Sequence, residues 1–135
     1  MSQPRNNNAV RQHQRYQCNI AAAVRFDEAD ARRVRLSPEA STSATTVACQ
    51  LIDASRGGVG FSSKVYLPPS IRLVVSMKVS GIVQEVRVKV QRVRMLDRTP
   101  SYYIGTSFIG TSEEHGRVVE ALLAECAQME GKASA

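Results

Sequence analysis

Two arginines four residues apart form the first group of side chains that could carry chemistry. Arg11 and Arg15 lie in a polar segment near the start of the chain. Residues at this spacing face the same side of the backbone in both a helix and an extended strand. A guanidinium group offers a planar fork of donors that suits phosphate groups and guanine edges. The pair can therefore close on one anion, although two arginines in a polar arm are also typical of solvated surface charges.

A second group follows in the sequence DASRGG, which runs from Asp53 to Gly58. The Asp53 carboxylate has two acceptor oxygens that can take both donors of a guanine Watson–Crick edge, and the Ser55 hydroxyl can add a further hydrogen bond. Gly58 has no Cβ, so a base or a phosphate could approach its backbone closely. The same residue types are also typical of a turn, in which Asp and Ser bond nearby amides and glycine adopts left-handed conformations. Both interpretations stay open at this point.

Catalytic and metal-binding groups are sparse. Neither His13 nor His115 has a neighbouring cysteine or carboxylate at the spacing of a metal site or a catalytic triad. The three cysteines, Cys18, Cys49 and Cys126, have no zinc-ligand spacing, and their odd number suits a reducing compartment. The one glycine-rich segment joins two predicted strands, whereas a phosphate-binding loop joins a strand to a helix. We therefore predict that the protein is not an enzyme and has neither a metal ion nor a cofactor.

The composition predicts one soluble domain with an excess of positive charge. The chain has 135 residues, of which 43% are hydrophobic, and this excludes a disordered, collagen-like or disulfide-scaffold protein. No apolar run approaches the roughly 18 residues of a membrane span, and no apolar signal segment begins the chain, so we expect a cytoplasmic location. The 18 basic and 12 acidic residues leave a net charge of +6, and such an excess attracts polyanions.

The elements that must position these groups are predicted from hydrophobic periodicity. Residues 1–15 are polar and basic, and we expect a flexible arm there. Apolar residues alternate in six segments, and a slip of the alternation at Gln91 and Arg92 predicts a β-bulge. The predicted strands cover 16–26, 46–52, 59–63, 71–79, 86–95 and 102–108. The connection over 27–45 is long and polar, and its arginines, Arg32, Arg33 and Arg35, are expected to be solvated.

The final segment changes from a period of two to a period of 3.6. Val119, Leu122, Cys126 and Met129 then form one apolar face of a helix. We expect Thr111 and Glu114 to form a capping box at its start, and Gly131 to end it. The fold class is therefore mainly β, and we predict a small six-stranded antiparallel β-barrel with a C-terminal α-helix over one end.

The order and spacing of the two groups resemble the PilZ domain family, which consists of bacterial receptors for cyclic di-GMP. Arg-x-x-x-Arg stands directly before the first predicted strand, and Asp-x-Ser-x-x-Gly stands between the second and third strands. The sequence YIGTSF over 103–108 is similar to the family's last-strand pattern, and the terminal helix is in the expected place. The resemblance covers about residues 10 to 130.

The resemblance implies a second-messenger receptor and a role for each motif residue. Arg11 and Arg15 would grip the phosphates and the Hoogsteen edges of the guanines of cyclic di-GMP. Asp53 and Ser55 would hold a guanine, and Gly58 would be the position of close approach. Arg56 and Gly57 fill the variable positions of the motif and are additional candidates for ligand contact.

The resemblance also implies an organisation and a switch. An arm over 1–15 would precede a PilZ-like domain over 16–130, and a tail would cover 131–135. Ligand would order the arm and thereby change a surface offered to a downstream protein partner, whose identity the sequence does not give.

Two alternatives stay open beside this interpretation. A small basic β-barrel could bind nucleic acid, although only Tyr102 and Tyr103 are available as adjacent aromatics for base stacking. A PilZ-like protein could also act as a protein adaptor that binds no nucleotide.

Overall fold

The computed structural model describes residues 14–26, 30, 41–43, 46–98, 101–110 and 112–134. Several predictions fall outside these residues. They are the basic arm up to His13, including Arg11, the capping role of Thr111, and the arginines of the long connection, Arg32, Arg33 and Arg35.

The described residues form seven strands and one long helix. The strands are β1 (Tyr16–Phe26), β2 (Ser41–Ser43), β3 (Thr46–Ala54), β4 (Val59–Ser63), β5 (Arg72–Val79), β6 (Ile82–Asp97) and β7 (Ser101–Phe108), and the helix is α3 (Glu113–Ser134). All six predicted strands are present, so the mainly β prediction is confirmed. A short seventh strand, β2, lies in the long connection and was not predicted, because its three polar residues have no alternation that could reveal it.

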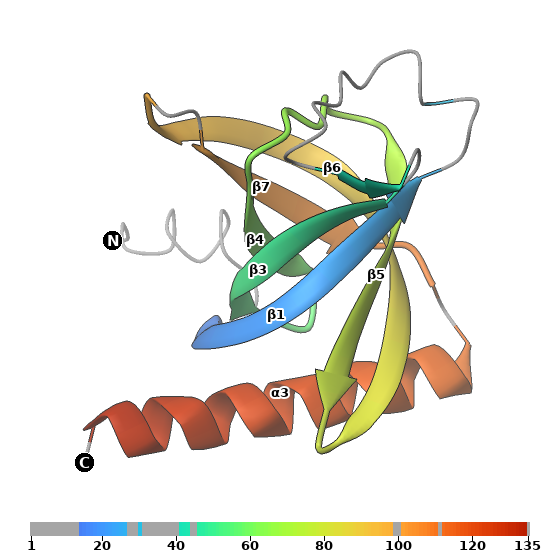
Figure 1. Cartoon of the computed structure of the whole chain (residues 1–135). Helices are drawn as coiled ribbons and strands as arrows, with labels where there is room; N and C mark the ends of the chain where they lie inside the picture. The colour runs from blue at the N-terminus through green and yellow to red at the C-terminus, as the bar shows by residue number, and fades with distance from the viewer. Residues whose placement is uncertain are drawn as a thin grey trace, which may run out of the picture.

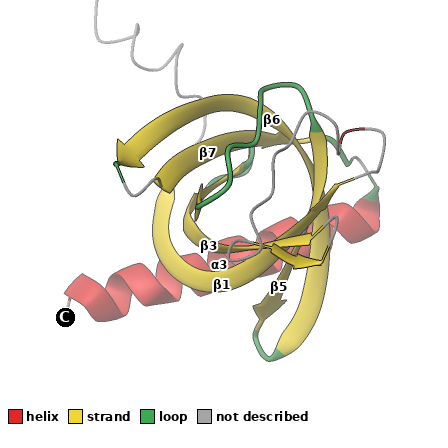
Figure 2. Ribbon diagram, turned by 45° about the horizontal axis from the view of Figure 1, so that its top comes forward, coloured by secondary structure: helices red, strands yellow, loops and turns green. Residues whose placement is uncertain are grey.

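The described strands all pair antiparallel in one sheet. Their order is β1-β5-β6-β7-β4-β3-β2, and β1 also pairs with β3. The six longer strands therefore follow one another in a closed cycle of pairings. The strands curve around a common interior in Figure 2, and α3 lies along one side of the curved sheet in Figure 1. The helix contacts β1, β3, β5 and β6.

The core fills the space between the curved strands and the helix. Its fully buried side chains come from almost every strand, and the largest is Phe61 of β4. On the helix, Leu122 and Cys126 are fully buried, Val119 is nearly so, and Met129 packs against the same cluster. The predicted apolar face of the helix is therefore confirmed. Burial of these apolar side chains stabilises the fold and fixes where α3 sits.

The helix begins at Glu113 and extends beyond its predicted end. The Ser112 hydroxyl accepts a hydrogen bond from the His115 amide at 3.0 Å, so Ser112 is the N-cap residue. The helix continues past Gly131 to Ser134. Among the described residues, no helix combines the length and the hydropathy that crossing a membrane requires.

Three irregularities of strand register lie close together and shape one end of the sheet. The β6–β7 register shifts between Val90 and Arg92, which confirms the predicted bulge. The register of β1 against β3 shifts just after Gln17, and that of β3 against β4 shifts just before Asp53. Bulges bend a strand and redirect the side chains next to them. All three irregularities therefore affect the directions of the polar side chains at this end of the sheet.

Candidate functional site

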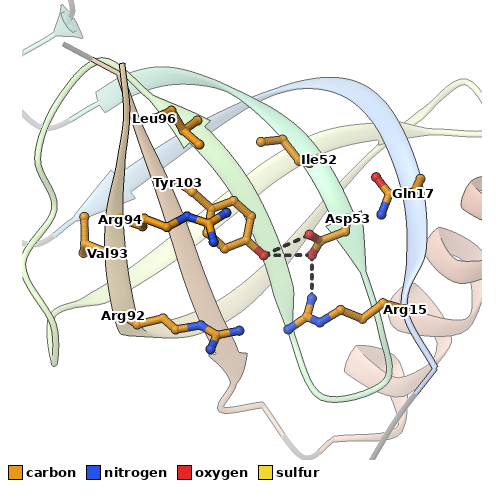
Figure 3. A pocket seen from close by; sticks show the side chains of 9 residues that line it. All are labelled: Arg15, Gln17, Ile52, Asp53, Arg92, Val93, Arg94, Leu96 and Tyr103. Atoms are coloured by element: carbon orange, nitrogen blue, oxygen red, sulfur yellow. Dashed lines mark hydrogen bonds and ion pairs between the residues drawn. The ribbon is translucent and has the colours of Figure 1, made fainter. Parts of the chain in front are cut away.

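A cavity of about 570 Å³ opens at this end of the sheet. Its volume is within the range of roughly 300–1,000 Å³ that is usual for small-molecule sites. It is lined by Arg15 and Gln17 at the start of β1, Ile52 and Asp53 near the end of β3, Arg92, Val93, Arg94 and Leu96 of β6, and Tyr103 of β7. Figure 3 shows the charged side chains and the Tyr103 ring converging on this space. Three arginines around one carboxylate favour an anionic ligand that also carries hydrogen-bond donors.

A row of residues that lie opposite one another on successive strands links Asp53 to Arg92. Gln17 pairs with Asp53, Asp53 with Gly60, Gly60 with Gly105, and Gly105 with Arg92. Gly60 and Gly105, in the middle of this row, have no side chains. The space between Asp53 and Arg92 is therefore not filled by side chains from these two positions. A Cβ at Gly105 would lie 3.2 Å from the Arg92 side chain. The glycine thus lets that arginine lie flat across β7.

Asp53 is the centre of the hydrogen bonds in the cavity. The Arg15 guanidinium donates to its Oδ1 at 2.5 Å, and the two side chains are 21% and 11% exposed. The Tyr103 hydroxyl lies 2.9 Å from Oδ2 and 3.2 Å from Oδ1. Bonds to a charged acceptor in a largely buried place are stronger than neutral ones. Asp53 is therefore held in one orientation by Arg15, which directly precedes β1, and by Tyr103 of β7.

Tyr103 reaches Asp53 across Gly60. A Cβ at Gly60 would overlap the Tyr103 hydroxyl, so the absence of a side chain there makes room for the phenol. Burial, together with the neighbouring Asp53 carboxylate, raises the pKa of Tyr103, which keeps its hydroxyl protonated as a donor. The Arg94 guanidinium carbon lies 5.3 Å from the centre of the Tyr103 ring, a cation–π contact.

The family model for the PilZ domain matches residues 9–125, which is most of the chain. The chain belongs to the PilZ domain family. No curated protein sequence matches it.

Solved structures with the same fold include PilZ domains that were determined with cyclic di-GMP. The PilZ domain of YcgR from Escherichia coli with c-di-GMP has a TM-score of 0.65 and 14% identity, and covers 92% of this chain and 97% of that one. The K. pneumonia MrkH–c-di-GMP complex has a TM-score of 0.64 and 15% identity over 93% of this chain and 55% of that one. The YcgR–c-di-GMP complex from E. coli has a TM-score of 0.63 and 14% identity, and covers 92% of this chain and 49% of that one. This PilZ domain thus spans about half the length of the two longer proteins, and identities this low show a shared fold alone.

Two of the predicted site residues of this PilZ domain meet in the cavity, namely Arg15 and Asp53. Asp53 was expected in a turn, but it lies within β3, which continues to Ala54. The β-bulge before Asp53 lets the strand continue while the acid turns towards the cavity. Arg11 lies outside the described residues.

Ser55 lies in the turn between β3 and β4 and serves that turn directly. It is buried, and its hydroxyl oxygen accepts from the Gly57 amide at 3.1 Å. The Ser55 amide donates to the Gly58 carbonyl at 2.9 Å. Ser55 does not line the Asp53 cavity. In this structure it holds the turn that follows Asp53.

The backbone of Gly58 lies very close to the backbone of β7. A Cβ at Gly58 would overlap the carbonyl oxygen of Thr106 and lie 2.9 Å from the Ser107 Cα. Its φ is not in the left-handed region, so the left-handed conformation offered by the turn interpretation was wrong for this glycine. Gly58 is therefore required for space between two backbones, a reason that only the fold reveals.

The additional candidates Arg56 and Gly57 do not line the Asp53 cavity. Arg56 forms an ion pair with Glu120 of α3, and this pair raises the pKa of Arg56. The Gly57 carbonyl accepts from the Phe108 amide at 2.9 Å. Arg56 and Glu120 line a separate cavity of about 440 Å³ beside the helix. The turn between β3 and β4 therefore contacts both the end of β7 and α3.

Sequence reasoning missed Arg92, Arg94 and Tyr103 as site residues. The predicted bulge at Gln91 and Arg92 was a signal, because bulges often redirect side chains next to binding sites. Tyr103 was noted as part of an aromatic pair and of the YIGTSF pattern, and not as a site residue. Tyr103 lies opposite Arg94 of β6 in the strand register. Such a pairing is not visible before the register is known.

Proposed function

We propose that this PilZ domain is a receptor for cyclic di-GMP and that the cavity around Asp53 holds one guanine of the ligand. The observation that carries the proposal is the contact between Arg15 and Asp53 at the mouth of an arginine-lined cavity. The YcgR and MrkH structures contain the same ligand, c-di-GMP, which supports the choice among anionic nucleotides.

The chemistry of the two side chains fits the two edges of guanine. A carboxylate accepts from the ring N–H and the exocyclic amine of the Watson–Crick edge, and a guanidinium donates to O6 and N7 of the Hoogsteen edge. Arg92 and Arg94 bring further positive charge to the same cavity. These arginines would favour a ligand with phosphates close to the base.

The remaining motif residues have different parts in this proposal. Arg11 would join Arg15 on the phosphates or the second guanine. Ser55 and Gly58 would act by holding the turn that sets the position of Asp53, and Arg56 and Gly57 stay additional candidates for contact with the ligand. The closed cycle of strand pairings makes the domain, in our interpretation, a small barrel that presents the site at its rim.

The proposed output is a change of surface rather than a reaction. Ligand would draw the segment before β1, which carries Arg11, against the cavity and so alter what a downstream protein meets. The domain organisation follows from this, with an arm up to residue 15 and a PilZ domain from residue 16. Hydrogen exchange of residues 1–15 should slow on addition of cyclic di-GMP, and unchanged exchange in saturated protein would contradict the arm's role.

Two substitutions test the site assignment. Arg15→Ala and Asp53→Ala should each weaken cyclic di-GMP binding by about a hundredfold or more, because charge-assisted bonds contribute roughly 1.5–3 kcal/mol each and the pair acts together. Calorimetric titration gives the affinities, and urea unfolding shows whether each variant still folds cooperatively. Arg72→Ala is the matched control, since it removes one positive charge from an exposed position that does not line the cavity. Wild-type affinity in both site variants would contradict the assignment.

A further inference from the structure

The Tyr103 hydroxyl occupies the side of Asp53 that a guanine would need. It lies 2.9 Å from one carboxylate oxygen and 3.2 Å from the other, so it sits in front of the carboxylate between its two oxygens. The Arg15 guanidinium bonds Oδ1 alone. Figure 3 shows the two partners reaching the carboxylate from different directions. Of these two partners, Tyr103 is the one that contacts both oxygens.

Two-point recognition of guanine needs these same two oxygens. The ring N–H and the exocyclic amine are parallel donors, and each takes one oxygen of a carboxylate. A phenol placed between the oxygens stands in the path of both donors. A guanine cannot form both bonds to Asp53 until the Tyr103 hydroxyl has left.

We propose that Tyr103 is an internal competitor for Asp53 and thereby sets the affinity of the site for guanine. This inference rests on the proposed function and names a residue outside both sequence motifs. In the free protein the Tyr103 hydroxyl satisfies the buried carboxylate. In the complex the guanine replaces it, and the phenol turns out towards solvent, where water can take its hydrogen bond.

Two neighbours make this exchange possible. Gly60 provides the space in which the hydroxyl lies, and a Cβ there would overlap it. Arg94 contacts the face of the Tyr103 ring and lines the same cavity. Because the hydroxyl is the far end of a side chain, it can leave Asp53 without movement of β7. Arg94 then keeps its positive charge in the cavity, beside the entering base.

Tyr103→Phe tests the competition directly, because it removes the hydroxyl and keeps the ring. We expect the variant to bind cyclic di-GMP about tenfold more tightly than wild type, since the ligand no longer has to break a hydrogen bond to a charged group. Calorimetric titrations of both proteins at the same pH and salt give the ratio. Urea unfolding of the variant checks that its fold is intact.

The outcomes separate this inference from the proposed function. If neither protein binds cyclic di-GMP, the proposed function fails. If wild type binds and Tyr103→Phe binds equally or more weakly, the competition is refuted while the receptor function stands. The hydrogen bond between Tyr103 and Asp53 can also be tested without ligand. Burial and the Asp53 carboxylate both raise the pKa of Tyr103, so Asp53→Asn, which removes the second cause, should lower the pKa of one tyrosine in an ultraviolet absorbance titration. An unchanged titration would also overturn the inference.

Discussion

Replacing Gly58 with alanine should destabilise the fold, because the space for a side chain is already occupied by β7. The new Cβ would overlap the Thr106 carbonyl oxygen and lie 2.8 Å from the Thr106 carbonyl carbon and 2.9 Å from the Ser107 Cα. These atoms are backbone, so no side-chain rotation relieves the overlap. The two backbone segments must move apart by about 1.5 Å, since ordinary contacts begin near 3.5 Å and the Thr106 carbonyl oxygen lies closest.

The magnitude follows from what that movement would disturb. Overpacking of this kind typically costs about 1–3 kcal/mol. The Thr106 hydroxyl also donates to the Val59 carbonyl at 2.8 Å, and loss of such a bond costs about 1 kcal/mol. We therefore expect the free energy of unfolding to fall by about 3 kcal/mol, which corresponds to a drop of about 10 °C in Tm for a domain of this size.

The assay is equilibrium unfolding in urea, with Gly116→Ala as the matched control. Gly116 lies in α3, and nothing lies within 4 Å of the Cβ that alanine would add. The control should therefore gain about 0.5–1 kcal/mol from the better helix propensity of alanine. If Gly58→Ala is as stable as wild type, the packing role of Gly58 is refuted, and its importance would lie in ligand contact alone.

Two further predictions concern the core and the thiols. Leu122→Ala should lower the free energy of unfolding by about 2–5 kcal/mol, because this helix side chain is fully buried, and a smaller loss in urea unfolding would contradict the docking of α3 on the sheet. Burial raises the pKa of the Cys49 thiol to about 12. The folded protein therefore keeps this proton while the unfolded chain loses it, so stability should fall as the pH rises from about 9 to about 12. Cys49→Ser should show a shallower fall over that range, and an equal fall would refute the buried thiol as a cause.

The strands and the helix could be predicted because their side chains follow a regular period. Alternation located β1 and β5, and the slip at Gln91 located the bulge in β6. β2 could not be predicted, since its three polar residues have no alternation. The helix continued through Gly131 to Ser134 although glycine is a common helix end.

The candidate site was predictable only in part. Arg15 and Asp53 were found because their residue types and spacing match a family motif. Arg92, Arg94 and Tyr103 reach the same cavity through strand register and the β6 bulge, and a single sequence does not display these pairings. The role of Gly58 depends on the approach of Thr106 from β7, forty-eight residues later, so it too needed the fold.

Calorimetric titration with cyclic di-GMP tests the central claim most directly. The wild-type protein should bind it saturably, while GTP and a short oligonucleotide in parallel titrations should give no saturable heat. Binding to the oligonucleotide alone, with a steep dependence on salt, would favour a nucleic-acid protein instead. Absence of binding to any of the three would contradict the receptor function and leave a PilZ domain that acts only through protein contacts.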